Sequence, residues 1–416
     1  MMNISIVTGS FFPQISPRSF RATELAKELV RQGHKVDVYI PQTPYDYRIF
    51  EEENDLKVKF VKINLNAGFE LKGNAFSIFI KRIANRIMKT YLSYPSIQFL
   101  WILPQCFSKT KGYDLLISIA TPHPIHWGID KSLRKNPKLS KIWIADCGDP
   151  FMLCQTDTFK NPFYFKSYEK SFCRKANAIT IPVASAKIGY YSEFWDKLYV
   201  VPQGFDFTNI RKVERFTPHE VITFAYAGNL IPGLRDPRPV LDFLIEQDVD
   251  FRFYIYTKQM HLLKNYTELL GEKLILNDYI DRLDLIYKMS SYDFVLNLEN
   301  GTTVQMPSKL IDYALCGRPV LSIFSQNIDR VKFLQFLNRD YSQHDVIEDM
   351  EDYNIKNVAK KFIFLANESR GLLKTPKSRL ATEAKAELTN EAGAESKLVL
   401  ILPCKEEEDI QSIYLK

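Results

Sequence analysis

Residues that could bind a charged ligand are concentrated in the stretch PSKLIDYALCGRPVL, residues 307–321. Its opening proline suits the first turn of a helix, and Gly317 is typical of a helix end. A helix N-terminus offers free N–H groups and partial positive charge, and Ser308 and Lys309 fall at this position. Asp312 follows one turn later, where a carboxylate can accept hydrogen bonds from sugar hydroxyls. The stretch therefore predicts a site for a nucleoside diphosphate.

The composition is that of a folded protein with more than one domain. The chain has 416 residues, 46% hydrophobic and 25% charged, with a net charge of +6. This length suggests two domains of roughly 200 residues each. The mild positive charge fits an anionic ligand or membrane surface and argues against a nucleic-acid partner. The six cysteines form no CxxC pair, so we expect neither a zinc site nor a disulfide framework, and a reducing cytoplasm is the simplest location.

Short apolar runs alternate with helical patterns, which is typical of an α/β protein with parallel sheets. The expected strands are residues 4–7, 36–40, 58–63, 115–119, 142–145, 179–183 and 198–201, then 222–227, 251–256, 273–276, 294–298 and 320–324. They predict two doubly wound, Rossmann-like domains that face each other across a cleft. The expected division is a first domain at 1–205, a linker at 206–220, a second domain at 221–352, a closing helix at 353–369 and a mobile tail at 370–416.

Four segments taken together resemble the GT-B fold glycosyltransferases, in particular the bacterial family 4-like enzymes of cell-surface polysaccharide biosynthesis. The segments are VTGSFFPQISPRSFRATELAKELVRQGHKVDVYIP, YDLLISIATPHPIHWG with KIWIADCGDPF, VVPQGFD, and FAYAGNLIPGLRDPRPVLDFL with QMPSKLIDYALCGRPVL. The resemblance covers about residues 1–367. It implies a metal-independent transfer of a hexose-type sugar from a UDP- or GDP-linked donor to a glycan hydroxyl, with no cofactor. The acceptor, expected to be polyprenyl-linked, would bind the first domain, and the donor would bind the second.

The resemblance also implies roles for residues of the second domain. It places the ribose hydroxyls at Asp312 and the diphosphate at Ser308 and Lys309. Val304 stands where the family has a first acidic residue, and Glu299 lies five residues earlier as a substitute on the donor side. Each of these residues could instead have an ordinary surface or capping role.

The loop that follows the first strand of the second domain adds further candidates. Gly228 permits close backbone approach to a ligand, and Asn229 follows it. The resemblance implies a basic residue here that contacts the diphosphate, and Arg235 matches its position better than Arg238 does. Alternatively, either arginine could simply form a surface pair with Asp236.

In the first domain, polar residues follow three expected strands. Arg18 and Arg21 come after the first strand, and by resemblance this loop touches donor phosphate or acceptor. His123 and His126 follow residues 115–119, where His123 is a candidate catalytic residue and His126 a candidate cleft residue.

Asp146 and Asp149 end the expected strand 142–145. A carboxylate at this edge could be the general base for an acceptor hydroxyl. Asp149 precedes a proline, however, and its role could instead be limited to forming a turn.

Residues 74–94 form an amphipathic helical pattern with a basic face. The pattern fits a helix that lies on anionic lipid, which would make the protein cytoplasmic and peripheral on the inner face of the membrane. The alternative is a helix packed on its own domain, which is the commoner case.

Two other functions fit the same residues. A nucleotide-sugar 2-epimerase of the same fold would need no acceptor. A non-catalytic nucleotide-binding subunit of a glycan-assembly complex is the other alternative, because Val304 replaces an acidic residue.

Overall fold

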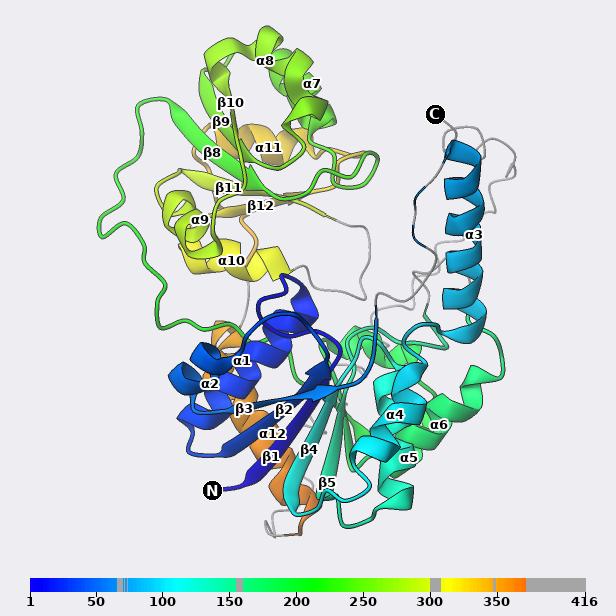
Figure 1. Cartoon of the computed structure of the whole chain (residues 1–416). Helices are drawn as coiled ribbons and strands as arrows, with labels where there is room; N and C mark the ends of the chain where they lie inside the picture. Colours follow the sequence, from blue (N-terminus) through cyan, green and yellow to red (C-terminus); the bar gives the residue numbers. More distant parts are fainter. Residues whose placement is uncertain are drawn as a thin grey trace. The chain divides into compact units, whose positions relative to one another are not determined.

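The computed structural model describes residues 1–65, 70, 72, 74–154, 160–299, 308–346 and 349–371, without the side chains of residues 308 and 309. It contains two parallel sheets that follow one another along the chain (Figure 1). The predicted tail from residue 372 onward and Val304 lie outside the described residues.

The first sheet has seven parallel strands in the order β3-β2-β1-β4-β5-β6-β7. Its strands are β1 (Asn3–Thr8), β2 (Lys35–Pro41), β3 (Lys57–Val61), β4 (Tyr113–Ile119), β5 (Ser140–Asp146), β6 (Ala178–Ile181) and β7 (Leu198–Val200). In register, Ile6 of β1 faces Val38 of β2 and Ile117 of β4. The strand order reverses between β1 and β4, so ligands are expected at the carboxyl ends of these two strands.

Helices cover both faces of this sheet. They are α1 (Pro17–Arg31), α2 (Arg48–Asn54), α3 (Ala75–Leu92), α4 (Gln98–Cys106), α5 (Pro124–Lys135) and α6 (Phe165–Lys175). The start of α1 is fixed by its own sequence, because the Ser16 side chain accepts from the Ser19 N–H and Pro17 occupies the first turn. Helix α3 is an exception to the packing pattern, because none of its residues is buried.

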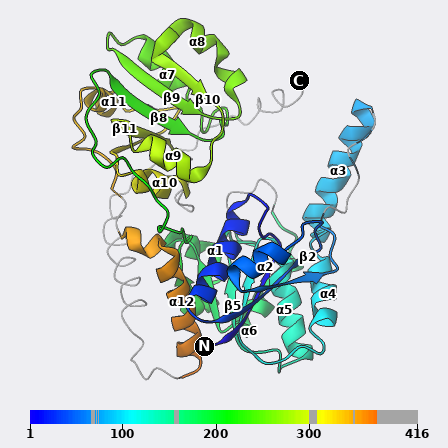
Figure 2. The same cartoon turned by 60° about the vertical axis from the view of Figure 1, so that its left-hand side comes forward.

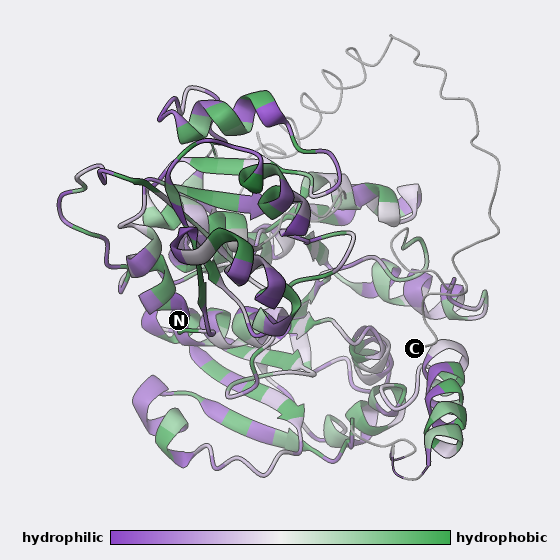
Figure 3. Ribbon diagram, turned by 90° about the horizontal axis from the view of Figure 1, so that it is seen from above, coloured by the Kyte–Doolittle hydropathy of each residue, from purple (hydrophilic) through white to green (hydrophobic). Residues whose placement is uncertain are grey.

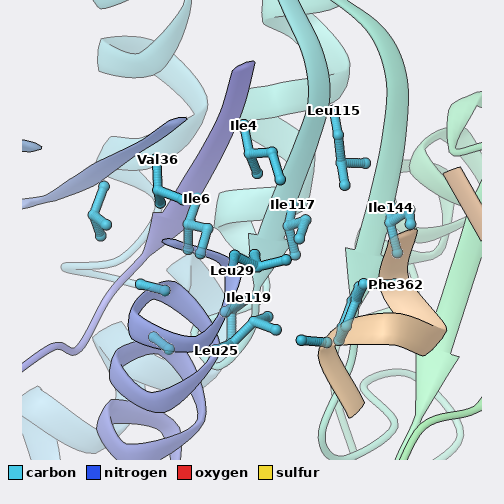
Figure 4. Close-up of a cluster of buried hydrophobic side chains, with 14 of the residues drawn as sticks. Ile4, Ile6, Leu25, Leu29, Val36, Leu115, Ile117, Ile119, Ile144 and Phe362 are labelled. Carbon is cyan, nitrogen blue, oxygen red and sulfur yellow. The ribbon is translucent and has the colours of Figure 1, made fainter. Parts of the chain in front are cut away.

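The last described helix, α12 (Ile355–Ser369), returns to the first sheet after the chain has built the second (Figure 2). Its Phe362 packs with Leu25 and Leu29 of α1 and with the aliphatic residues of β1, β2, β4 and β5 (Figure 4). Helix α12 therefore closes the core of the first lobe, so this lobe requires residues from both ends of the described chain.

The second sheet has five parallel strands in the order β10-β9-β8-β11-β12. Its strands are β8 (Ile222–Ala227), β9 (Phe251–Tyr256), β10 (Leu274–Asn277), β11 (Phe294–Leu298) and β12 (Val320–Ile323). Its helices are α7 (Arg238–Ile245), α8 (Lys264–Leu270), α9 (Arg282–Met289), α10 (Ser308–Cys316) and α11 (Arg330–Leu337). Phe224 lies at the centre of one core, stacked between Phe253 and Phe294 at centroid distances of 4.5 and 4.6 Å.

All twelve predicted strands are present, and the predicted doubly wound α/β class is confirmed. Green apolar and purple polar residues alternate along many helices, as the sequence pattern required (Figure 3). Residues 206–220 contain neither helix nor strand, and we propose that they link the two lobes as predicted. Within the described residues, no helix combines the length and the apolar character needed to span a bilayer.

Candidate functional site

A pocket of about 1030 Å³ opens at the carboxyl ends of the first-lobe strands. Loops that follow four strands line it: residues 9–11 after β1, 41–44 after β2, 121–124 after β4 and 149–151 after β5. This is the edge at which doubly wound sheets bind ligands. Helix α3 and the residue that follows it add polar side chains to the same wall: Arg86, Lys89, Thr90 and Ser93.

Two of the predicted catalytic residues, His123 and Asp149, meet in this pocket. The His123 ring donates from Nε2 to the backbone oxygen of Asp149 over 2.9 Å. Burial, together with the nearby charge of Arg18, lowers the pKa of His123 to about 4. His123 is therefore neutral at pH 7, holding the loop of Asp149 while the half-buried Asp149 lines the pocket.

Arg18, a predicted cleft residue, lies beside this loop. Its guanidinium packs directly over Gly148, where a Cβ atom would overlap it. Its charge also acts on the buried Asp146 behind the loop. The absence of a side chain at residue 148 thus lets a cation approach the turn that carries Asp149.

The structure corrects the roles predicted for Arg21 and Asp146 at the cleft. Arg21 donates from Nε and Nη2 to the two carboxylate oxygens of Asp146, at 3.0 and 2.8 Å. Thr180 donates to the same carboxylate at 2.6 Å. Both members of the ion pair are buried, so Asp146 cannot reach an acceptor hydroxyl. The pair instead ties α1 to β5 in the core.

His126 is also corrected, because it is fully buried and does not reach the pocket wall. Its Nδ1 lies 2.8 Å from Ser118 Oγ, and its Nε2 lies 3.4 Å from Cys147 Sγ. Burial lowers the pKa of His126 to about 3, which keeps the ring neutral in the folded protein. Its role is to fill the core between β4 and α6, where it packs on Phe172.

A pH dependence of stability follows from His126. Because its pKa is lowered from 6.5 in the folded state, the unfolded chain binds one more proton between about pH 6.5 and 3, and stability falls as the pH falls. Once the unfolded ring is fully protonated, the loss is about 1.4 kcal/mol per pH unit. The buried Glu169 opposes it, since burial raises its pKa from 4.5 to about 7. We therefore expect His126→Gln to make the unfolding free energy, measured in urea, fall less steeply with decreasing pH, by the equivalent of one bound proton.

The exposed His261 provides the matched control for this measurement. His261→Gln should leave the slope between pH 6 and 4 as in the unmodified protein. An unchanged slope in His126→Gln would show that His126 is protonated inside the fold.

In the second lobe, hydrogen bonds connect β8 to α10 at the predicted ligand edge. The Tyr313 hydroxyl of α10 donates to the Ala227 oxygen at 3.1 Å and accepts from the Ala227 N–H at 3.3 Å. Gly228 follows with a φ of +148°, and its N–H donates to the Tyr256 oxygen at 2.9 Å. The exposed Asn229 comes next. The two segments predicted to bind the donor are thus brought together.

Asp312 lies in the second turn of α10 and is half-buried. Arg282 at the start of α9 contacts its Oδ1 from Nε at 2.8 Å and from Nη2 at 2.6 Å. Ser308 and Lys309 begin the same helix, but their side chains lie outside the described residues. The sequence did not identify Arg282, because it precedes Asp312 by thirty residues and no local pattern connects them.

Arg235 and Glu299 occupy the loops that surround this edge. The Nε of Arg235 is buried and has no hydrogen-bond partner in the described part of the chain. Arg238, in contrast, forms the local pair with Asp236, at 2.8 and 2.6 Å. Glu299 directly follows β11, and burial raises its pKa, with Asp345 adding to the effect.

Comparisons with known proteins identify the fold class. No family model matches the chain, and no curated protein matches it in sequence. Solved structures do match over 88–90% of this chain and the whole of theirs. A glycosyltransferase from Rickettsia africae matches with a TM-score of 0.59 at 10% identity. S. aureus TarM, solved with UDP and alpha-GlcNAc-glycerol, matches with a TM-score of 0.57 at 11% identity. The lipopolysaccharide outer core galactosyltransferase WaaB matches with a TM-score of 0.54 at 14% identity. The chain therefore has the GT-B fold.

The same fold also includes an enzyme of another class. A UDP-N-acetylglucosamine 2-epimerase matches with a TM-score of 0.52 at 12% identity, over 91% of this chain and 99% of its own. At identities of 10–14%, these structural matches establish the fold alone. The reaction has to be argued from the residues of the two lobes.

Proposed function

We propose that this protein is a glycosyltransferase of cell-surface polysaccharide synthesis. It would transfer a hexose-type sugar from a UDP- or GDP-linked donor to a hydroxyl of a lipid-linked glycan, without a metal ion, at the inner face of the cell membrane. The observation that carries the proposal is the joining of α10 to the Gly228 turn at the ligand edge of the second lobe, on a GT-B fold.

The donor would bind the second lobe through its charged parts. The N-terminus of α10, with Ser308 and Lys309, would hold the diphosphate, and Arg235 would add a second positive charge. The ribose hydroxyls would donate to the Asp312 carboxylate. Negative charge grows on the diphosphate as its bond to the sugar breaks, so fixed positive groups at this place lower the barrier.

The acceptor would bind the pocket of the first lobe. Its hydroxyl oxygen attacks the anomeric carbon, the bond from that carbon to the phosphate oxygen breaks, and the hydroxyl proton passes to the Asp149 carboxylate. Arg86 and Lys89 on the α3 side of the pocket would pair with the phosphate of a lipid-linked acceptor. Closure over both substrates would exclude water and limit hydrolysis of the donor.

A thermal-shift screen with UDP, GDP, CMP and dTDP and their common sugars tests donor binding. Ligand at about one hundred times its dissociation constant adds about 2.7 kcal/mol of stability, or about 5–10 °C for a lobe of this size. Asp312→Ala should weaken binding of the stabilising nucleotide at least tenfold in calorimetry. Asp284→Ala removes a more exposed carboxylate of the same lobe and should change nothing. An Asp312→Ala affinity equal to the unmodified value would remove Asp312 from the site.

The epimerase is the second candidate, and its structural match is the observation that favours it. It differs from the transferase in needing no acceptor. Incubating the protein with the stabilising sugar nucleotide alone, followed by chromatography of the sugar, separates the two reactions. A new epimeric sugar nucleotide would favour the epimerase, whereas unchanged donor that is consumed when a glycan acceptor is added would favour the transferase.

A further inference from the structure

Helix α3 presents an apolar stripe that its own lobe does not cover. Six large apolar side chains on one side of α3 are between 45% and 72% exposed: Phe76, Phe79, Ile80, Ile83, Ile87 and Tyr91. Figures 1 and 2 show α3 projecting from the end of the first lobe. The expected alternative of a helix packed on its domain is therefore wrong, because packing would bury at least part of this stripe.

The charges of α3 have one sign. The helix carries Lys81, Arg82, Arg86 and Lys89 and contains no acidic residue. With about 100° of rotation per residue, these four cations lie on the side and back of the helix relative to the apolar stripe. Aromatic and aliphatic residues on one face and cations on the rest are the composition of helices that lie in the plane of an anionic lipid surface.

Two exposed aromatic residues extend the stripe at the end of α3. The Tyr164 hydroxyl donates to the backbone oxygen of Tyr91. The ring of Phe163 lies 5.7 Å from that of Tyr164 and is 85% exposed. An amphipathic tyrosine beside an exposed phenylalanine suits the interface between lipid headgroups and acyl chains. The uncovered surface is thus built from two separate segments.

The pocket opens beside this surface. Arg86, Lys89 and Thr90 of α3 line the pocket and lie on the flank of the helix next to the apolar stripe. A flat lipid surface against the apolar stripe would therefore lie next to the pocket without filling it.

We propose that the apolar stripe of α3, with Phe163 and Tyr164, docks the first lobe on an anionic membrane, with the pocket beside the lipid surface. The choice of occupant rests on charge complementarity, because a helix with four cations and no anion suits acidic headgroups. A second copy of the chain would bring like charges together along the same helix. The docking itself does not depend on the proposed function, because it needs no turnover. Only the use of the neighbouring pocket for a lipid-linked acceptor rests on the proposed function.

Sedimentation of the full chain with vesicles tests the proposal. We expect binding to phosphatidylcholine vesicles that contain about 30% phosphatidylglycerol, and much weaker binding to pure phosphatidylcholine. Lys81→Gln with Arg82→Gln, both outside the pocket, should weaken binding to the anionic vesicles about 30-fold, at about fivefold per charge. Failure to bind anionic vesicles would overturn the proposal and leave the nucleotide tests above unaffected.

A triple variant tests the apolar stripe itself. Phe79→Ser, Ile83→Ser and Ile87→Ser together should reduce vesicle binding at least 100-fold. The control removes three apolar residues elsewhere that are even more exposed: Ile49→Ser, Leu269→Ser and Val331→Ser. Equal loss in the two triple variants would contradict a specific role for α3, and an unchanged urea midpoint of the first lobe in the α3 triple would show that this lobe is folded.

Quenching by brominated lipids identifies what covers the helix. A tryptophan at Ile83→Trp should be quenched strongly on brominated anionic vesicles, while one at Val331→Trp should not. Light scattering after size exclusion without lipid checks for a second copy. A dimer that the α3 triple variant converts to a monomer, with no quenching of the tryptophan in α3, would assign the stripe to self-association and reject the membrane.

Discussion

Replacing Arg21 with alanine is expected to lower the free energy of unfolding of the first lobe by about 3–5 kcal/mol. Arg21 and Asp146 are 3% and 2% exposed at their side chains and share two hydrogen bonds. Burial alone would raise the pKa of Asp146, but the charge of Arg21 holds it below its usual value. Without the guanidinium, the core would retain a charged carboxylate, and the backbone oxygens of Val201 and Pro202 would lose their donor.

Urea unfolding followed by circular dichroism measures this effect. At an m-value of about 3 kcal/mol/M, the midpoint of the first-lobe transition should fall by about 1 M or more. Arg48→Ala is the control, because Arg48 also pairs with an aspartate but at the surface, and we expect no change in the midpoint.

A double variant tests whether the loss of stability comes from leaving an unpaired charge in the core. Arg21→Met with Asp146→Leu leaves no buried charge, so it should be more stable than Arg21→Ala alone. An unchanged midpoint in Arg21→Ala would mean that Asp146 is neutral or solvated in the fold, and that the two residues do not form a buried ion pair.

Most of the strands could be predicted because they are short, apolar and buried on both faces. The run 115–119, for example, has no polar alternation, as expected for a parallel strand between two helix layers. The ends of these runs also located the ligand edge, and His123 and Asp149 do line a pocket there. Local sequence was sufficient for these features because strand formation and strand ends depend on local composition and turns.

Burial at the strand ends could not be predicted in the same way. Asp146 ends β5 and Asp149 lies three residues later in the loop, yet the first is buried and the second lines the pocket. The difference comes from Arg21 on α1 and from Phe362 of α12, whose ring lies 5.3 Å from the Arg21 guanidinium. Contacts between segments so distant in sequence leave no local pattern.

Helix α3 shows a second limit. Its 3.6-residue period predicts an amphipathic helix, but a period cannot say what covers the apolar face. Arg86 and Lys89 were expected on the basic face toward lipid, and the structure places both in the pocket wall. The same helix thus contributes to two surfaces, which only the arrangement of the loops around it reveals.

Asp149→Asn is expected to reduce the rate of sugar transfer by about 10²–10⁴-fold while leaving nucleotide affinity unchanged. An asparagine of the same shape keeps the loop and its hydrogen bond from His123, which goes to the backbone oxygen of residue 149. It removes only the carboxylate that would take the acceptor proton. Release of nucleoside diphosphate from the donor found in the thermal-shift screen, with and without acceptor, measures the rate.

Asp196→Asn is the control for Asp149→Asn, because Asp196 is an exposed aspartate of the same lobe outside the pocket. It should keep the full rate. A rate near that of the unmodified protein in Asp149→Asn would assign the proton to another group and leave Asp149 as a turn residue before Pro150.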